Sequence, residues 1–194
     1  DALMAGLENI SDTLEALSAY FAYSISNLEQ YATVMEEIRN VSDYITVQKY
    51  RFGESLKFDV EYVEDDPEYF ETICMPRFVL QPIVENAIYH GLEVRDKRGS
   101  IRIRLQRTRT RLIIDVIDDG VGMSWNAVEV LNQKLVHAEG GRNAVQKKKG
   151  IALINVNSRI KLLFGREYGL YVYSTEDVGT DVKMTLPVTP MERL

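Results

Sequence analysis

The sequence predicts an α+β fold, in which amphipathic helices precede a two-layer α/β sandwich with one mostly antiparallel mixed sheet. Up to residue 53, apolar residues recur mainly at the steps of three and four that are typical of helices. From Ser55 onward, short segments alternate apolar and polar residues, and helical stretches separate them. This segregation favours a helical segment over residues 1–53 followed by a sandwich domain over residues 54–190.

Two helices are expected in the first segment. The first has a heptad-like apolar seam, formed by Leu3, Leu7, Ile10, Leu14, Leu17, Phe21 and Leu28. The second begins at Thr33, where Glu36 completes a capping box, and ends at Gly53. Two interpretations stay open: the helices cover a core, or they form a bundle that pairs two subunits.

The second segment alternates between strand and helix patterns. Strands are expected over residues 56–62, 101–105 and 112–117, and a hairpin over 170–174 and 182–186. Helices are expected over 76–90, 124–136 and 151–164. The polar stretch that ends at Lys149 contains Gly140 and Gly141 and few apolar groups to offset the entropy of ordering, so we expect a mobile loop there.

Composition excludes several classes of function. The net charge of −6 makes a nucleic-acid partner a poor expectation. The single cysteine, Cys74, excludes an internal disulfide and a cysteine-rich metal site. No apolar run approaches the ~20 residues of a membrane helix, so we expect a cytoplasmic chain without membrane contact of its own.

Polar residues interrupt the apolar helix expected over residues 76–90. Asn86 and His90 are four residues apart and share a face, with Glu85 beside them. An Asn amide oxygen suits Mg²⁺ beside phosphates, and a carboxylate can accept a proton from a nucleophile. The alternative is that these side chains only face solvent.

Three further segments carry weaker signals. Asp118 to Gly122 places a carboxylate and two glycines after a strand, which suits a ligand's exocyclic amine or simply a tight turn. Lys149 and Gly150 open a helix whose N–H groups could bind phosphate, although a solvated lysine run is the commoner explanation. Gly179-Thr180 alone means a turn. His137 is interpreted as a surface residue, and the P-loop and dinucleotide-binding patterns are absent.

In this order, the four segments resemble the GHKL ATPase fold of histidine kinases, gyrase and MutL, and more closely the LytS/YesM type of sensor histidine kinase. Residues 80–91, LQPIVENAIYHG, resemble the asparagine box of that type almost letter for letter. Residues 118–123 resemble its first glycine box, residues 150–160 its second, and residues 179–187 its closing strand. Residues 47–53 resemble the link into the catalytic domain.

The resemblance implies a role for each motif. Asn86 would hold Mg²⁺ against the ATP phosphates, Glu85 would polarise or orient the acceptor histidine, and Asp118 would receive the adenine amine. Thr180 would support Asp118, and residues 123–149 would form a lid. The full set of implied ATP-binding residues is Asn86, His90, Asp118, Gly120, Gly122, Met123, Lys149, Gly150, Ile151, Ala152, Leu153 and Thr180.

The implied reaction is transfer of the γ-phosphoryl group to a histidine, for relay to a response regulator. Two departures stand out: Ala152 replaces the family's usual glycine, and the family's Pro-His-Phe acceptor motif does not occur. We therefore expect a piece of a kinase that lacks the acceptor helix, from a parent that is homodimeric and, by resemblance, membrane-anchored. Two alternatives remain: a GHKL serine kinase of the anti-sigma type, and a nucleotide-sensing interaction module without phosphotransfer.

Overall fold

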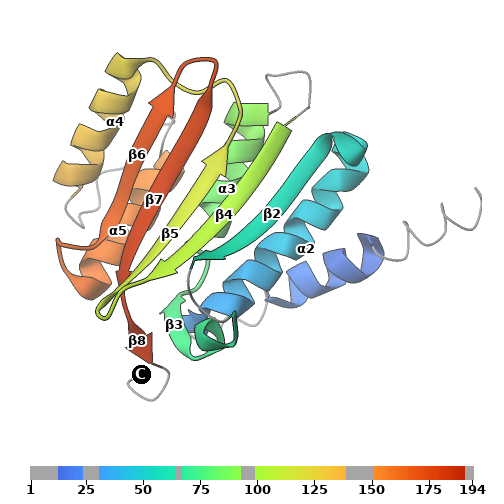
Figure 1. Cartoon of the computed structure of the whole chain (residues 1–194), viewed down its shortest axis with the longest axis horizontal. Helices are drawn as coiled ribbons and strands as arrows, with labels where there is room; N and C mark the ends of the chain where they lie inside the picture. The colour runs from blue at the N-terminus through green and yellow to red at the C-terminus, as the bar shows by residue number, and fades with distance from the viewer. Residues whose placement is uncertain (1–12, 24–30, 64–66, 93–98, 139–150, 191–194) are drawn as a thin grey trace, which may run out of the picture.

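A five-stranded sheet backed by helices organises the chain (Figure 1). The computed structural model describes residues 13–23, 31–63, 67–92, 99–138 and 151–190. The strand order is β2-β4-β5-β7-β6. The bounds of these strands are β2 Leu56–Val63, β4 Gly99–Arg107, β5 Arg111–Asp118, β6 Gly169–Thr175 and β7 Gly179–Pro187. Only β2 and β4 pair in parallel, and the other three ladders are antiparallel, which confirms the predicted mixed sheet.

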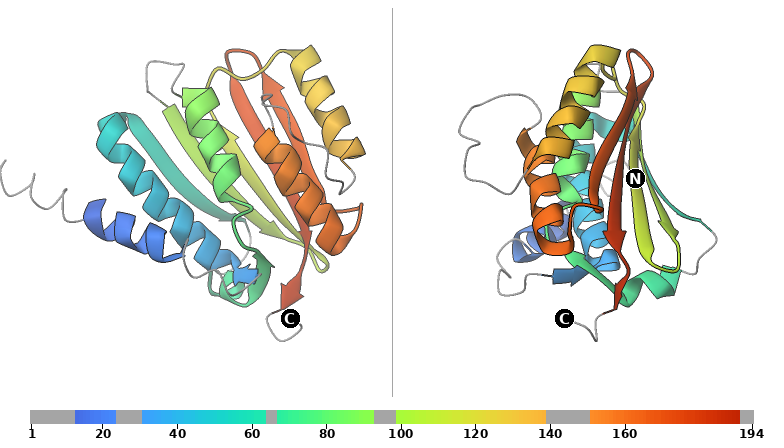
Figure 2. Two further views of the ribbon diagram at one scale, coloured as in Figure 1. Left: turned by 180° about the vertical axis from the view of Figure 1, so that it is seen from behind. Right: turned by 90° about the vertical axis from the view of Figure 1, so that its left-hand side faces the viewer.

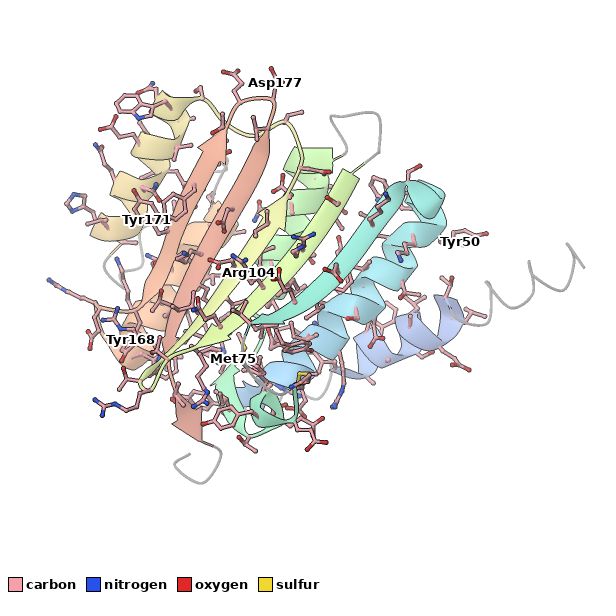
Figure 3. All side chains as sticks on the ribbon, viewed as in Figure 1. Tyr50, Met75, Arg104, Tyr168, Tyr171 and Asp177 are labelled. Atoms are coloured by element: carbon pink, nitrogen blue, oxygen red, sulfur yellow. The ribbon has the colours of Figure 1, made fainter. Side chains whose placement is uncertain are left out.

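The alternation of side chains gives the sheet two different faces. On β5, Leu112, Ile114 and Val116 are buried in the core, together with the apolar positions of the neighbouring strands. The helices α2, α3 and α5 lie on this covered face (Figure 2). Charged and aromatic side chains such as Arg104 and Tyr171 occupy the other, open face (Figure 3).

Helix α2, Val34–Phe52, joins the helical segment to the core. Thr33 is its N-cap and forms the predicted capping box with Glu36, and Gly53 ends it with φ 64°. Its apolar stripe enters the core, through Val34, Ile38, Val41, Tyr44, Ile45 and Phe52. Of the two interpretations left open, α2 thus fits the one in which the helix covers a core.

The first helix is described only over residues 13–23. Ala16 is buried, whereas Leu14 and Phe21 of the predicted seam are more than half exposed. Leu3, Leu7, Ile10 and Leu28 lie outside the described residues.

A second, three-stranded sheet in the order β1-β3-β8 was not predicted. It consists of β1 Tyr31–Thr33, β3 Ile73–Pro76 and β8 Thr189–Pro190. The helix expected from residue 76 was wrong in its start, because Pro76 ends β3 and α3 begins at Gln81. The residues of β3 are all buried, and an apolar run of four gives no periodicity that separates strand from helix. Helix α3, Gln81–Asn86, continues as a π-helix over Ala87–Leu92.

Helix α4, Trp125–His137, lies along the edge strand β6, and α5, Ile151–Phe164, lies on the covered face. The Asn132 side chain donates to the carbonyl of Val172 on β6 and accepts from the amide of the same residue. Asn157 donates to the Leu135 carbonyl and accepts from the Leu170 amide. These two buried asparagines fix α4 and α5 to the edge strand, whose backbone would otherwise lack partners. None of the described helices combines the length and apolar character that crossing a bilayer requires.

Candidate nucleotide and phosphotransfer site

Asp118 is the last residue of β5 and points to the covered face of the sheet, where it is 7% exposed. Its Oδ1 accepts the Gly120 amide at 2.9 Å, and its carboxylate also accepts the Thr180 amide. Burial raises the pKa of Asp118 to about 6, since it outweighs these two hydrogen bonds, and the neighbouring Asp119 adds to the rise. Near neutral pH, the side chain is thus a buried acceptor of hydrogen bonds.

Two hydroxyls hold the β6–β7 hairpin beside Asp118. Ser174 donates to the Gly179 carbonyl at 2.7 Å and accepts the Met123 amide at 2.9 Å. Its oxygen lies 2.9 Å from that of Thr180. Since the single Ser174 proton goes to Gly179, Thr180 is the donor in this pair. Ser174 is a site residue that the sequence analysis missed, because a serine in a strand carries no signal of its own.

The adjacent carboxylate of Asp119 has a different role. Its two oxygens accept the Ser100 amide at 2.6 Å and the Ser100 hydroxyl at 2.8 Å. Asp119 therefore holds the start of β4 to the end of β5, whereas Asp118 faces the interior.

Gly122 and Gly179 are required by packing within the chain. Gly122 has φ +62°, and a Cβ there would lie 2.0 Å from the Thr175 carbonyl oxygen. A Cβ on Gly179 would lie 2.0 Å from the Asp118 carbonyl oxygen. The turn after β5 thus packs directly against the β6–β7 hairpin, which fixes the backbone on both sides of Asp118. Gly120 contributes its amide to Asp118.

Helix α3 carries Glu85 and Asn86, both partly buried. The Asn86 Nδ2 donates to the Pro82 carbonyl at 2.6 Å, so the nitrogen is the engaged half of the amide, whereas Mg²⁺ would bind the oxygen. Glu85 Oε1 accepts from the Gln81 Nε2 at 2.7 Å. The π-helix that begins at Ala87 is a feature found often at functional sites.

The start of α3 is fixed by a buried carboxylate on α2. Glu37 is fully buried, and it accepts the amides of Phe78, Val79 and Leu80 at 2.7–3.2 Å. The Tyr23 hydroxyl also donates to it, and burial and the Glu37 charge raise the pKa of Tyr23, so the donor keeps its proton. Burial raises the pKa of Glu37, against the lowering effect of its four donors.

Helix α5 begins at Ile151, followed by the half-buried Ala152 and the buried Leu153. The first N–H groups of a helix have no partner within it, so this end suits an anion. Lys149 and Gly150, with the rest of the predicted lid from residue 139 on, lie outside the described residues, as does the side chain of His90. His137 is exposed at the end of α4, as predicted for a surface residue.

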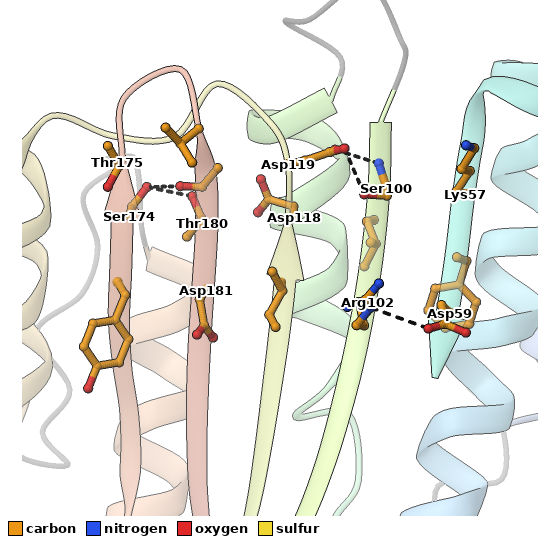
Figure 4. A pocket seen from close by; sticks show the side chains of 16 residues that line it. Lys57, Asp59, Ser100, Arg102, Asp118, Asp119, Ser174, Thr175, Thr180 and Asp181 are labelled. Atoms are coloured by element: carbon orange, nitrogen blue, oxygen red, sulfur yellow. Dashed lines mark hydrogen bonds and ion pairs between the residues drawn. The ribbon is translucent and has the colours of Figure 1, made fainter. Parts of the chain in front are cut away.

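A depression of ≈ 680 Å³ lies at the hairpin end of the open face (Figure 4). Exposed side chains such as Asp59, Arg102 and Tyr173 line it, together with Asp118 and Thr180, where β5 ends and β7 begins. Glu85, Asn86 and the start of α5 do not line it. Because α3 and α5 cover the opposite face, this depression is not the nucleotide site that the four motifs predict.

The covered face offers donors and acceptors that fit ATP and Mg²⁺. The buried Asp118 carboxylate can accept an amine, the start of α5 can donate to phosphate, and the Asn86 oxygen can bind a cation. The described residues contain no cluster of three or more His, Cys, Asp or Glu side chains that could hold a metal. Mg²⁺ bound through substrate phosphates needs only one or two protein ligands.

Comparison with known proteins agrees with this arrangement. Residues 75–190 match the family described as histidine kinase-, DNA gyrase B- and HSP90-like ATPase, and residues 2–56 match the family described as histidine kinase. The chain is 33% identical over 180 residues to the sensor histidine kinase YesM of Bacillus subtilis, covering 93% of this chain and 28% of YesM. It is 29% identical over 186 residues to the sensor protein LytS of Staphylococcus saprophyticus, covering 95% of this chain and 29% of LytS.

The chain thus spans less than a third of the length of these relatives. Among solved structures, the catalytic domain of the histidine kinase ThkA superposes with a TM-score of 0.59 at 19% identity, over 82% of this chain and 97% of that domain. This structural likeness shows the fold, and the sequence matches show the family. The chain belongs to the histidine kinase-, DNA gyrase B- and HSP90-like ATPase family, and its sequence is similar to those of the sensor histidine kinases YesM and LytS.

Proposed function

We propose that the chain binds Mg-ATP on the covered face of its sheet and transfers the γ-phosphoryl group to a histidine of an acceptor helix. The observation that carries the proposal is Asp118, a buried carboxylate fixed by the amides of Gly120 and Thr180 on the face that α3 and α5 cover. A buried acceptor held this way suits the exocyclic amine of adenine, which donates a hydrogen bond. A base with a carbonyl oxygen at the same place has no proton to donate and would be excluded.

In this proposal each residue has one task. Asp118 accepts the adenine amine, and the amides at the start of α5, with Lys149 and Gly150, donate to the phosphates. Asn86 holds Mg²⁺, which would neutralise charge on the phosphate oxygens. His90 and Met123 belong to the pocket wall, and Gly120, Gly122 and Thr180 shape its adenine end.

The transfer itself needs a nucleophile in line with the γ-phosphate. A ring nitrogen of the acceptor histidine forms a bond to the γ-phosphorus, and the bond to the β,γ-bridging oxygen breaks, so that ADP leaves. Glu85 holds, or takes, the proton on the other ring nitrogen. Positioning and charge neutralisation supply most of the acceleration. The phosphoryl group would then pass to an aspartate of a response regulator.

The helical segment over residues 1–53 would belong to the region that pairs two kinase subunits, and residues 54–190 would form the catalytic domain. Residues 123–149 would include the lid over ATP, of which α4 is the described part.

The test uses this chain, labelled Mg-ATP and a separate peptide of the acceptor helix. Base-stable, acid-labile label on the peptide histidine is expected, and Glu85→Gln should lower transfer more than ATP binding. Acid-stable label on serine would instead identify a serine kinase of the anti-sigma type. Binding of ATP without any transfer would identify a nucleotide-sensing module, in which Ala152 narrows the phosphate site.

A further inference from the structure

The Gln81 side chain joins three helices at the base of α3. It is 7% exposed. Its Nε2 donates to the Tyr20 hydroxyl at 2.6 Å and to Glu85 Oε1 at 2.7 Å, and its Oε1 accepts from Asn40 Nδ2 at 3.0 Å. Tyr20 belongs to the helix over residues 13–23, and Asn40 to α2. Both protons and the oxygen of this amide thus have a hydrogen-bond partner. Two of the partners lie on other helices, and the third lies one turn further along α3.

The orientation of this network follows from the Glu85 carboxylate. An ionised carboxylate only accepts hydrogen bonds, so Gln81 must turn its nitrogen toward Glu85 and its oxygen toward Asn40. Asn40 must then donate, and its own Oδ1 is buried without a hydrogen-bond partner among the described residues. A buried carbonyl oxygen without a hydrogen bond is unfavourable. The network thus gives the Glu85 carboxylate a donor and leaves the Asn40 Oδ1 without one among the described residues.

Such a contact matters because glutamate has a long, flexible side chain, and Glu85 is only partly buried. A general base must stay within hydrogen-bond reach of the proton it takes, and small displacements lower the rate. A donor 2.7 Å from Oε1, itself buried and held by two other helices, restricts where that oxygen can lie.

We propose that Gln81 is a positioning residue for Glu85, and that through Tyr20 it makes the position of the Glu85 carboxylate depend on the helix over residues 13–23. The inference rests on the proposed role of Glu85 in phosphotransfer. Helix 13–23 contacts the core region through both of its tyrosines: the Tyr20 and Tyr44 rings lie 6.0 Å apart, and Tyr23 donates to Glu37 and packs against the Phe78 ring. A shift of this helix withdraws the Tyr20 hydroxyl and releases one of the three constraints on Gln81.

The experiment is a double-mutant cycle on transfer from Mg-ATP to the acceptor-helix peptide. Gln81→Met keeps the length of the side chain and removes its donors, so it should lower the transfer rate about tenfold with little change in the Kd for ATP. In a Glu85→Gln background the same substitution should change the rate less than twofold, because the residue acts only through the lost carboxylate. Tyr20→Phe, a milder change that keeps the ring, should lower the rate two- to threefold.

The control is Gln106→Met on β4, since Gln106 is an exposed glutamine on the open face of the sheet, away from Glu85 and from the proposed lid. It should leave transfer unchanged. A second measurement does not depend on transfer: three-bond NMR couplings that report the χ1 angle of Glu85. One rotamer is expected in the wild type, and averaged values in Gln81→Met.

Equal losses from Gln81→Met in both backgrounds, or an unchanged single Glu85 rotamer, would overturn the inference and leave the proposed function standing. The proposed function would fail if the wild type transferred no phosphoryl group to the peptide, or if Glu85→Gln transferred it as fast as the wild type. The rotamer measurement would still decide whether Gln81 holds Glu85.

Discussion

Asp118 on β5 lies directly opposite Thr180 on β7, and the Thr180 amide donates to the Asp118 carboxylate. The Thr180 hydroxyl is held in turn by Ser174 on β6. Three neighbouring strands therefore place one buried carboxylate at the end of the covered face, and the first predictions concern it.

Removing the Asp118 carboxylate should abolish nucleotide recognition. We expect Asp118→Ala to weaken ATP binding at least 100-fold by calorimetry, because both the acceptor and its fixed geometry are lost. Asp59→Ala is the control, since Asp59 is an exposed aspartate on the open face that pairs with Arg102. Equal affinity of the wild type for ATP and GTP would contradict the adenine role of Asp118.

Nucleotide affinity should fall as the pH is lowered through about 6. Burial raises the pKa of Asp118 from 3.8 to about 6, so the side chain is ionised and accepts the adenine amine above that pH, and is protonated below it. At pH 5 only about a tenth of the molecules would carry the carboxylate, so the Kd for ADP should rise about tenfold between pH 7.5 and pH 5. Asp118→Asn does not titrate and should give a flatter profile, and an identical pH dependence in that variant would refute the assignment.

Gly122 should tolerate no side chain. Gly122 and Gly53 have φ values of +62° and +64°, but a Cβ on Gly53 meets nothing within 4 Å, whereas one on Gly122 lies 2.0 Å from the Thr175 carbonyl. Gly53→Ala should therefore lower the free energy of unfolding only by the backbone strain, about 1–3 kcal/mol. Gly122→Ala should lower it by about a further 2 kcal/mol or more. Urea unfolding of both variants measures the difference, and similar losses would show that the hairpin can move away.

Glu37 should be among the residues most important for stability. Glu37→Leu leaves the amides of Phe78, Val79 and Leu80 buried without their acceptor, and we expect a loss of about 3–5 kcal/mol in the free energy of unfolding. Glu71→Leu is the control, because Glu71 forms an exposed ion pair with Arg39 and should cost less than about 1 kcal/mol. If the two variants were equally stable, the start of α3 would not depend on Glu37.

The chain alone should not phosphorylate itself, because the Pro-His-Phe motif that carries the family's acceptor histidine does not occur in its sequence. His137 is exposed at the end of α4, and His90 is part of the π-helix that follows Asn86. Mass spectrometry of the chain after incubation with Mg-ATP should find no stoichiometric phosphohistidine, and labelling should require the acceptor-helix peptide. Full occupancy of His90 or His137 would show that the acceptor has been misplaced.

Local pattern was enough for much of the fold. The capping box of Thr33 and Glu36, the end of α2 at Gly53, and the strands around residues 56–62, 101–105 and 112–117 are all in the structure, because each depends on neighbours in sequence or on the period of two or 3.6 residues. The family could also be read from the order of four motifs. The short strand Ile73–Pro76 escaped prediction, since four apolar residues have no period and their pairing partners are 41 or more residues away, as in Cys74 with Thr33 and Thr189.

The tertiary structure decided what the individual polar residues do. The family motif favoured Asp118, but two adjacent aspartates do not differ in residue type. In the structure, the Asp118 carboxylate lies on the covered face and the Asp119 carboxylate binds Ser100. The sequence assigned no role to Gln81, although it lies in the asparagine box, and it did not single out Tyr20, Asn40 or Glu37. A buried polar side chain is recognised only by the partners that distant segments bring to it. The sequence alone determined the chemical groups and the order of the elements. Long-range packing determined which groups meet, since hydrogen bonds act over about 3 Å and the fold joins side chains to partners up to 82 residues away in the sequence.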